Sequence, residues 1–151
     1  MTTITVRHLE ASRSASCGAI SYIELARLSA YSAFYGCIAY GMCKIAKRLA
    51  KITLNAVKNA PENEVIDPSG EFTARIEGVA SSSYELYSSI YSNQDLRKGS
   101  FFDRLIAKEL IALNHLHNEV LVCINEHNAD ASGLSHDGPY ESADDFISSL
   151  S

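Results

Sequence analysis

YSAFYGCIAYGMCKIAKRLAK, residues 31–51, is the stretch that decides the fold, because it is first uncharged and then strongly basic. The uncharged run from Leu28 to Cys43 has 16 residues, whereas a membrane-spanning helix needs about 20 apolar residues. The run also contains serine, glycine and several aromatic rings. The stretch therefore predicts a water-soluble helix that packs against protein and argues against a membrane helix.

Small residues recur at every fourth position of this stretch, at Ser29, Ala33, Cys37 and Gly41. Such a ridge lets a second helix approach closely, and we expect it to form a helix–helix interface. Two other helices of the same chain, or the same helix of a second subunit, could cover it. A tyrosine row further along the chain is a second candidate interface, formed by Tyr84, Tyr87 and Tyr91.

The basic half of the stretch forms a stripe of a single sign along one helix face. No acidic residue lies between Glu24 and Glu62. We expect the stripe to contact phosphate groups or an acidic protein segment, although a solvated face near a helix C-terminus would have the same pattern. Its members are Lys44, Lys47, Arg48, Lys51 and Lys58.

The first long helix is predicted to begin near Ser21, where Ser21 and Glu24 match a capping box. It should run to about Asn59, because Pro61 disfavours helix at the residue before it. Its length would be roughly 57 Å. Gly36 and Gly41 could bend it.

Two further helices are predicted after the first. Asp67 and Pro68 favour a helix start, and Gly99 favours its end. Ser100 can cap the next helix, which should run to about His127 as the second arm of an antiparallel hairpin. The expected buried stripes are Phe72, Ile76, Val79, Ser83, Leu86 and Ile90 in one helix, and Phe102, Ile106, Leu110, Leu113, His117, Val120 and Ile124 in the other.

The two ends of the chain differ from this helical domain, which we place at residues 21–128. Residues 3–9 have strand-like composition, which indicates an extended arm or a strand that pairs with another chain. Residues 10–20 are rich in serine and alanine, which indicates a linker or a frayed helix start, so we expect residues 1–20 to form an extended arm and linker. Residues 129–151 hold five acids and no base, whereas residues 1–128 hold thirteen of each. We therefore expect an acidic tail, whose apolar positions could dock on a basic partner. Those positions are Tyr140, Phe146, Ile147 and Leu150.

Catalytic and metal-binding patterns are weak in this sequence. Ser135-His136-Asp137 are direct neighbours, whereas the members of a triad must converge in space. His115 and Glu119 are four residues apart but lack a matching pair for a metal, and His117 falls in a buried stripe. No cysteine pair has zinc or redox spacing, and no cofactor fingerprint is present. We expect no enzyme activity, no cofactor, no metal site and no small-molecule substrate.

The sequence thus predicts an all-α bundle of three long helices with an extended N-terminal arm and an acidic C-terminal tail. The expected function is that of a structural or assembly protein, acting through helix-mediated oligomerisation or as a subunit of a larger complex such as a virion-type particle. The alternative is a small nucleic-acid-associated or regulatory protein that uses the basic stripe, with the acidic tail competing for it. The first segment has no signal-peptide pattern, so a reducing cytoplasm is the expected compartment.

Overall fold

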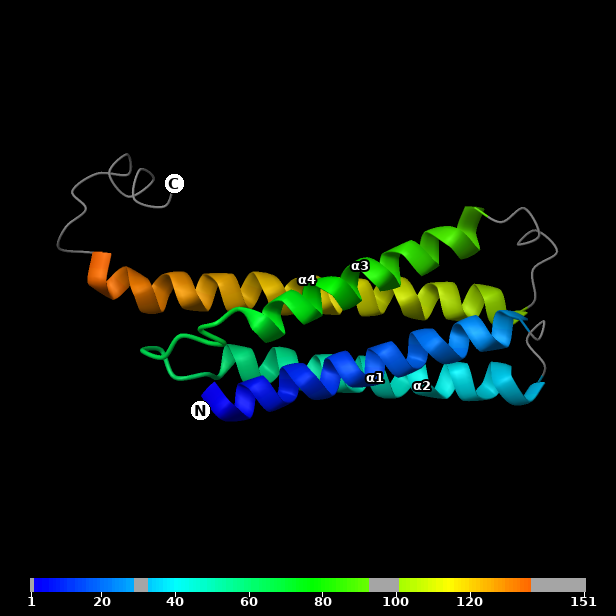
Figure 1. Ribbon diagram of the computed structural model, residues 1–151, viewed down its shortest axis with the longest axis horizontal. Helices are drawn as coiled ribbons and strands as arrows, with labels where there is room; N and C mark the ends of the chain where they lie inside the picture. Colours follow the sequence, from blue (N-terminus) through cyan, green and yellow to red (C-terminus); the bar gives the residue numbers. More distant parts are fainter. Residues whose placement is uncertain (1, 29–32, 93–100, 137–151) are drawn as a thin grey trace.

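The computed structural model describes residues 2–28, 33–92 and 101–136 of the chain, and these residues form four α-helices (Figure 1). The helices are α1 (Thr2–Leu28), α2 (Ala33–Lys58), α3 (Glu71–Ser92) and α4 (Phe101–His136). No strand occurs within those described ranges. The expected all-α class is confirmed, but the structure has four helices where three were predicted.

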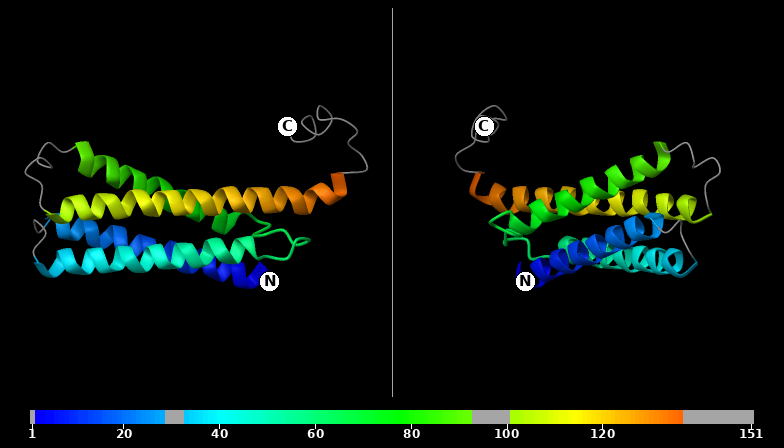
Figure 2. Two further views of the ribbon diagram at one scale, coloured as in Figure 1. Left: turned by 180° about the vertical axis from the view of Figure 1, so that it is seen from behind. Right: turned by 45° about the vertical axis from the view of Figure 1, so that its right-hand side comes forward.

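The helices form an elongated bundle in which each lies beside two others. α1 packs against α2 and α3, and α4 packs against the same two helices (Figures 1 and 2). The chain runs back and forth along the bundle, so α2 and α4 are neighbours that point in the same direction. Because α2 and α3 occupy opposite corners, the connection 59–70 crosses the end of the bundle.

The predicted extended arm at residues 1–20 is wrong, since this segment is the larger part of α1. Its buried positions follow a strict seven-residue repeat, which places one continuous face against the bundle. The β-branched residues near the start favoured a strand, and serines at two repeat positions hid the pattern, but burial of this face overrides local propensity. The buried positions are Thr5, Leu9, Ser12, Ser16, Ala19, Ile23 and Ala26.

The single long helix predicted from Ser21 to Asn59 is also wrong, because α1 ends at Leu28 and α2 begins at Ala33. Ser21 lies inside α1 and therefore caps nothing. Folding the segment back on itself lets α1 and α2 bury each other along their length, which one uninterrupted helix of roughly 57 Å could not do.

Helix α3 begins at Glu71, three residues later than Pro68, because the chain turns through left-handed backbone at Asp67 (φ 49°) and Gly70 (φ 74°). Asp67 still caps the helix, as predicted. Its Oδ2 accepts hydrogen bonds from the Thr73 backbone N–H at 2.7 Å and the Thr73 hydroxyl at 2.8 Å. Asp67 thus caps α3 from the turn that precedes the helix, and not from the residue directly before its first turn.

Helix α4 extends to His136, so residues 129–136 of the predicted tail are helical. The part of α4 just before this extension lies beside the connection 59–70 and is bonded to it. Asn128 accepts a hydrogen bond from the Ile66 N–H at 2.7 Å and donates one to the Ile66 carbonyl at 3.0 Å. The predicted features at Gly99, Ser100 and residues 137–151 lie outside the described residues.

The predicted stripes on α3 and α4 are confirmed at every position from Ile76 to Ile90 and from Ile106 to Ile124. The core consists of two apolar clusters, which follow one another along the bundle, and both stripes contribute to each cluster. Between the clusters, Ser12 Oγ and His117 Nε2 lie 2.8 Å apart with both residues fully buried. Burial lowers the pKa of His117 to about 4, so this histidine is neutral near pH 7.

Candidate interaction surface on helices α1 and α2

Small side chains do form the buried face of α2, but in a different row from the one predicted. The buried row includes Ala39, Cys43, Ala46 and Ala50. Next to it, a Cβ atom added to Gly18 of α1 would lie 3.1 Å from Met42 Cε, so α1 approaches α2 closely there. Short side chains therefore set the spacing of this helix pair.

The predicted ridge Ser29, Ala33, Cys37 and Gly41 is not a contact between helices of this chain at its two described positions. The side chain of Cys37 is exposed, and nothing lies within 4 Å of a Cβ atom added to Gly41. Ser29 and the side chain of Ala33 lie outside the description. Contact of this ridge with a second chain stays a prediction.

Large apolar side chains lie on the outer side of α2, away from its buried row. Phe34 is 68% exposed, Ile45 is 56% exposed and Ile52 is 43% exposed. With the half-buried Ile38 and Leu49 between them, they follow the spacing of a coiled-coil seam. This seam has no helix against it within the described chain.

Helix α1 continues the same surface. Tyr22 and Leu25 lie four and seven residues after Gly18, on the side of α1 that faces α2, and both are exposed. We call Tyr22, Leu25, Phe34, Ile45 and Ile52 the α1–α2 face. These five are most of the eight large apolar residues that are exposed in the described part of the chain.

Two lysines of the predicted basic stripe, the half-exposed Lys44 and the more buried Lys47, form ion pairs with Glu109 of α4. Lys44 Nζ lies 2.9 Å from Glu109 Oε1, and Lys47 Nζ lies 3.0 Å from Glu109 Oε2. The Glu109 side chain is only 7% exposed. Burial raises the pKa of Glu109, but the two lysines outweigh burial, so the net pKa is lowered. The pair joins α2 to α4, and the sequence alone did not identify Glu109.

The other three members of the stripe remain exposed, and we call Arg48, Lys51 and Lys58 the basic edge. Among the described residues, no ion pair is found for these three. Arg48 is three residues from Ile45 and four from Ile52, so it lies on the same side of α2 as the apolar seam. Positive charge therefore borders the α1–α2 face.

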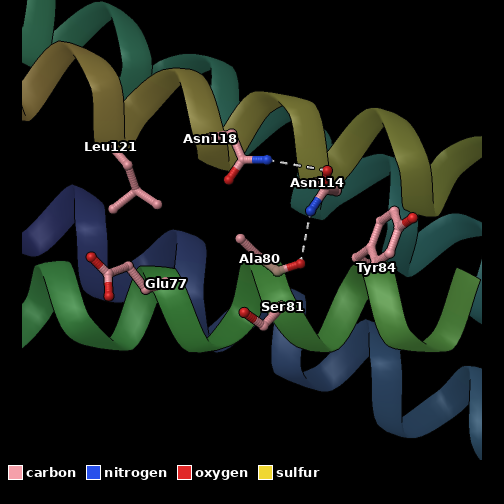
Figure 3. A pocket seen from close by; sticks show the side chains of 7 residues that line it. All are labelled: Glu77, Ala80, Ser81, Tyr84, Asn114, Asn118 and Leu121. Atoms are coloured by element: carbon pink, nitrogen blue, oxygen red, sulfur yellow. Dashed lines mark hydrogen bonds between the residues drawn. The ribbon is translucent and has the colours of Figure 1, made fainter.

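The opposite hairpin presents a groove of about 530 Å³ between α3 and α4, with a mixed polar and apolar lining (Figure 3). The buried Asn114 donates a hydrogen bond to the Ala80 carbonyl at 2.9 Å, and Asn118 donates one to Asn114 Oδ1 at 3.2 Å. Figure 3 shows Asn114 of α4 bonded to Ala80 of α3, with Asn118 bonded to Asn114 on the same helix. Asn114 thus ties α4 to α3, and Asn118 supports it.

The predicted tyrosine interface divides at this groove. Tyr87 is half-buried against the core cluster, whereas Tyr84 is exposed at the groove wall. Their ring centroids are 6.2 Å apart. The side chain of Tyr91 and the tail positions Tyr140, Phe146, Ile147 and Leu150 lie outside the described residues.

A shallow hollow of about 320 Å³ on α4 includes His115, Glu119 and Cys123. No group of three histidine, cysteine, aspartate or glutamate side chains that could hold a metal ion occurs in residues 2–28, 33–92 and 101–136. Likewise, none of the helices in these ranges is long and apolar enough to cross a membrane.

Comparison with protein-family models, curated proteins and solved structures found no match.

Proposed function

We propose that this protein is a non-enzymatic assembly protein, which associates with other protein chains through the α1–α2 face. The observation that supports the proposal is the exposed seam Phe34, Ile45 and Ile52 beside Tyr22 and Leu25. Large apolar side chains gathered on one side of a helix pair are typical of protein–protein contact sites. Reduced thiols at all four cysteines suit a cytoplasmic setting, which we include in the proposal.

The free energy gained by burying the α1–α2 face is of the size expected for reversible assembly. Full burial of a large apolar side chain is worth about 1.5–3 kcal/mol, and these side chains are roughly half-exposed. Five of them therefore contribute on the order of 5 kcal/mol from each partner. That gain is comparable with the cost of bringing two chains together, about 4–15 kcal/mol. We expect association that depends on protein concentration.

The test compares Ile45→Glu with Val122→Glu in the full chain. Val122 is 53% exposed on α4, so it matches Ile45 in exposure but lies on another helix. Ile45→Glu should weaken association at least tenfold, measured by sedimentation velocity and light scattering, because a carboxylate would be buried at the contact. Equal loss in both variants, or a wild-type chain that stays at its monomer mass of 16.5 kDa at every concentration, rejects the proposal.

Nucleic-acid binding through the basic edge is the second candidate function, and the exposed row Arg48, Lys51 and Lys58 is the observation that favours it. Because Glu109 holds Lys44 and Lys47, about three phosphate contacts are available from this row. The logarithm of the binding constant should then fall with the logarithm of salt concentration with a slope of roughly −3. Absence of binding to single- or double-stranded probes at low salt would remove this candidate.

A further inference from the structure

The α1–α2 face and the basic edge together define the chemistry of a suitable partner. The partner needs apolar side chains for Ile45 and Ile52, and acidic side chains next to them for Arg48 and Lys51. A second copy seated with its own α1–α2 face in an antiparallel two-fold pair would place the two basic edges on the same side of the contact. That arrangement brings like charges together, so an acidic partner fits better.

The chain itself contains a segment with this chemistry. Residues 137–151 hold four acids, Asp137, Glu141, Asp144 and Asp145, and no base. Phe146 and Ile147 directly follow Asp144 and Asp145, so apolar and acidic side chains are neighbours there as apolar and basic ones are on α2. The segment follows α4, which passes the connection 59–70 and so extends beyond the end of α2.

Helix geometry limits where this segment can reach on its own copy. The Lys47–Glu109 ion pair sets those two residues at one level of the bundle. From Glu109, α4 rises by about 40 Å to His136, so Ile52 lies about 33 Å behind the end of α4. By the same geometry Phe34 lies about 60 Å behind it.

A fully extended chain spans at most about 3.5 Å per residue. The ten residues from His136 to Phe146 therefore span about 35 Å, which leaves almost no slack for reaching Ile52 around the width of α2. All fifteen residues span about 50 Å, which falls short of Phe34. The α1–α2 face is thus beyond comfortable reach of the same copy, whereas the face of a neighbouring copy has no such limit.

We infer that residues 137–151 of one copy bind the α1–α2 face and basic edge of a second copy. Asp144 and Asp145 pair with Arg48 and Lys51, and Phe146 and Ile147 cover Ile45 and Ile52. The inference rests on the proposed assembly function and names the segment that fills the face. Every copy has one face and one acidic segment, so the contact is heterologous and either closes between copies or continues along a chain.

Two full-length variants test this contact by reversing its two sides. The first carries Arg48→Glu and Lys51→Glu, and the second carries Asp144→Lys and Asp145→Lys. Each variant alone should associate at least tenfold more weakly than the wild type, because like charges then meet at the contact. An equimolar mixture should regain the wild-type mass in light scattering, because each chain supplies the charge that the other requires.

The control variant reverses Arg104 and Lys108, two exposed bases of α4, to glutamate. It should leave association within twofold of the wild type. A mixture that stays monomeric when both variants are monomeric overturns the inference. So does wild-type association of the Asp144→Lys, Asp145→Lys variant alone, which would leave the proposed function in place with another occupant on the face. If the Asp144→Lys, Asp145→Lys variant associates like the wild type and Ile45→Glu does not, the proposed function stands. If Ile45→Glu also associates like the wild type, the proposed function fails as well.

Discussion

The α1–α2 and α3–α4 hairpins use their apolar residues in opposite ways. Along α2, small side chains such as Ala39 and Ala46 face the core, and the large Ile45 and Ile52 face outward. Along α4, the large Ile106 and Leu110 face the core, and the groove towards α3 has a mixed polar and apolar lining. One hairpin therefore supplies close helix contact and an outer apolar surface, while the other supplies most of the core volume.

This difference separates stability from association. Removing core volume from α4 should destabilise the fold, whereas changing the outside of α2 should change association and leave the fold intact. Substitutions on the two hairpins can therefore confirm the comparison or contradict it, and the expected effects differ in size.

The largest effect is expected from Leu110→Ala in α4. Leu110 is fully buried in the larger apolar cluster, and truncation of such a leucine costs about 2–5 kcal/mol through lost burial and the cavity left behind. The free energy of unfolding from urea titration measures the loss. Ile45→Ala is the matched change on the outer side of α2 and should cost less than about 1 kcal/mol. A similar cost for the two substitutions would contradict the proposed division between the hairpins.

The next effect is a loss of stability in acid, caused by the buried His117, which lies beside Ser12 between the two apolar clusters. Its folded pKa, about 4, lies below the ordinary value of 6.5, so the unfolded chain binds the proton first. The contribution of neutral His117 to the free energy of unfolding is therefore complete above pH 6.5. About 3 kcal/mol of this free energy is lost as the pH falls from 6.5 to 4. Urea titrations across this range measure it.

His115→Gln serves as the control for this pH dependence, because His115 is exposed on the same helix. It should leave the slope between pH 6.5 and 4 unchanged, whereas His117→Leu should flatten it. The lowered pKa of Glu109 also makes the fold less stable in acid, since that carboxylate is protonated as the pH falls through its folded value below 4.5. An unchanged slope in His117→Leu would show that other groups cause the acid loss.

The smallest effect is expected from glycine-to-alanine substitutions, which test whether the predicted small-residue ridge or the contact at Gly18 is the close approach between helices. Gly41→Ala should stabilise the chain by about 0.5–1 kcal/mol, because alanine favours helix over glycine and the added methyl group meets open space. Gly18→Ala should gain less, because its methyl group would press on Met42. Thermal unfolding of both variants measures the difference. Destabilisation by Gly41→Ala in the monomer would restore the predicted ridge as an intrachain contact.

Much of the α3–α4 hairpin was predictable because large apolar residues there recur at unambiguous spacing. The stripe from Ile106 to Ile124 and the capping role of Asp67 were both read correctly from the chain. The α1–α2 hairpin was not, because its repeat contains serine and alanine, which hydrophobic patterns do not distinguish from linker residues. In α2, small residues occupy two adjacent rows, so spacing could not decide which row is buried.

Spacing and composition alone were enough to predict the helical class, the buried stripes of α3 and α4 and the single-sign charge between Glu24 and Glu62. These are local properties of spacing and composition, and they hold whatever the helices pack against. The packing of the four helices was needed to establish that Glu109 holds Lys44 and Lys47, that residues 2–28 are helical and that Ile45 faces outward. Each of those depends on which helix lies beside which, and that arrangement follows from burial summed over the whole bundle.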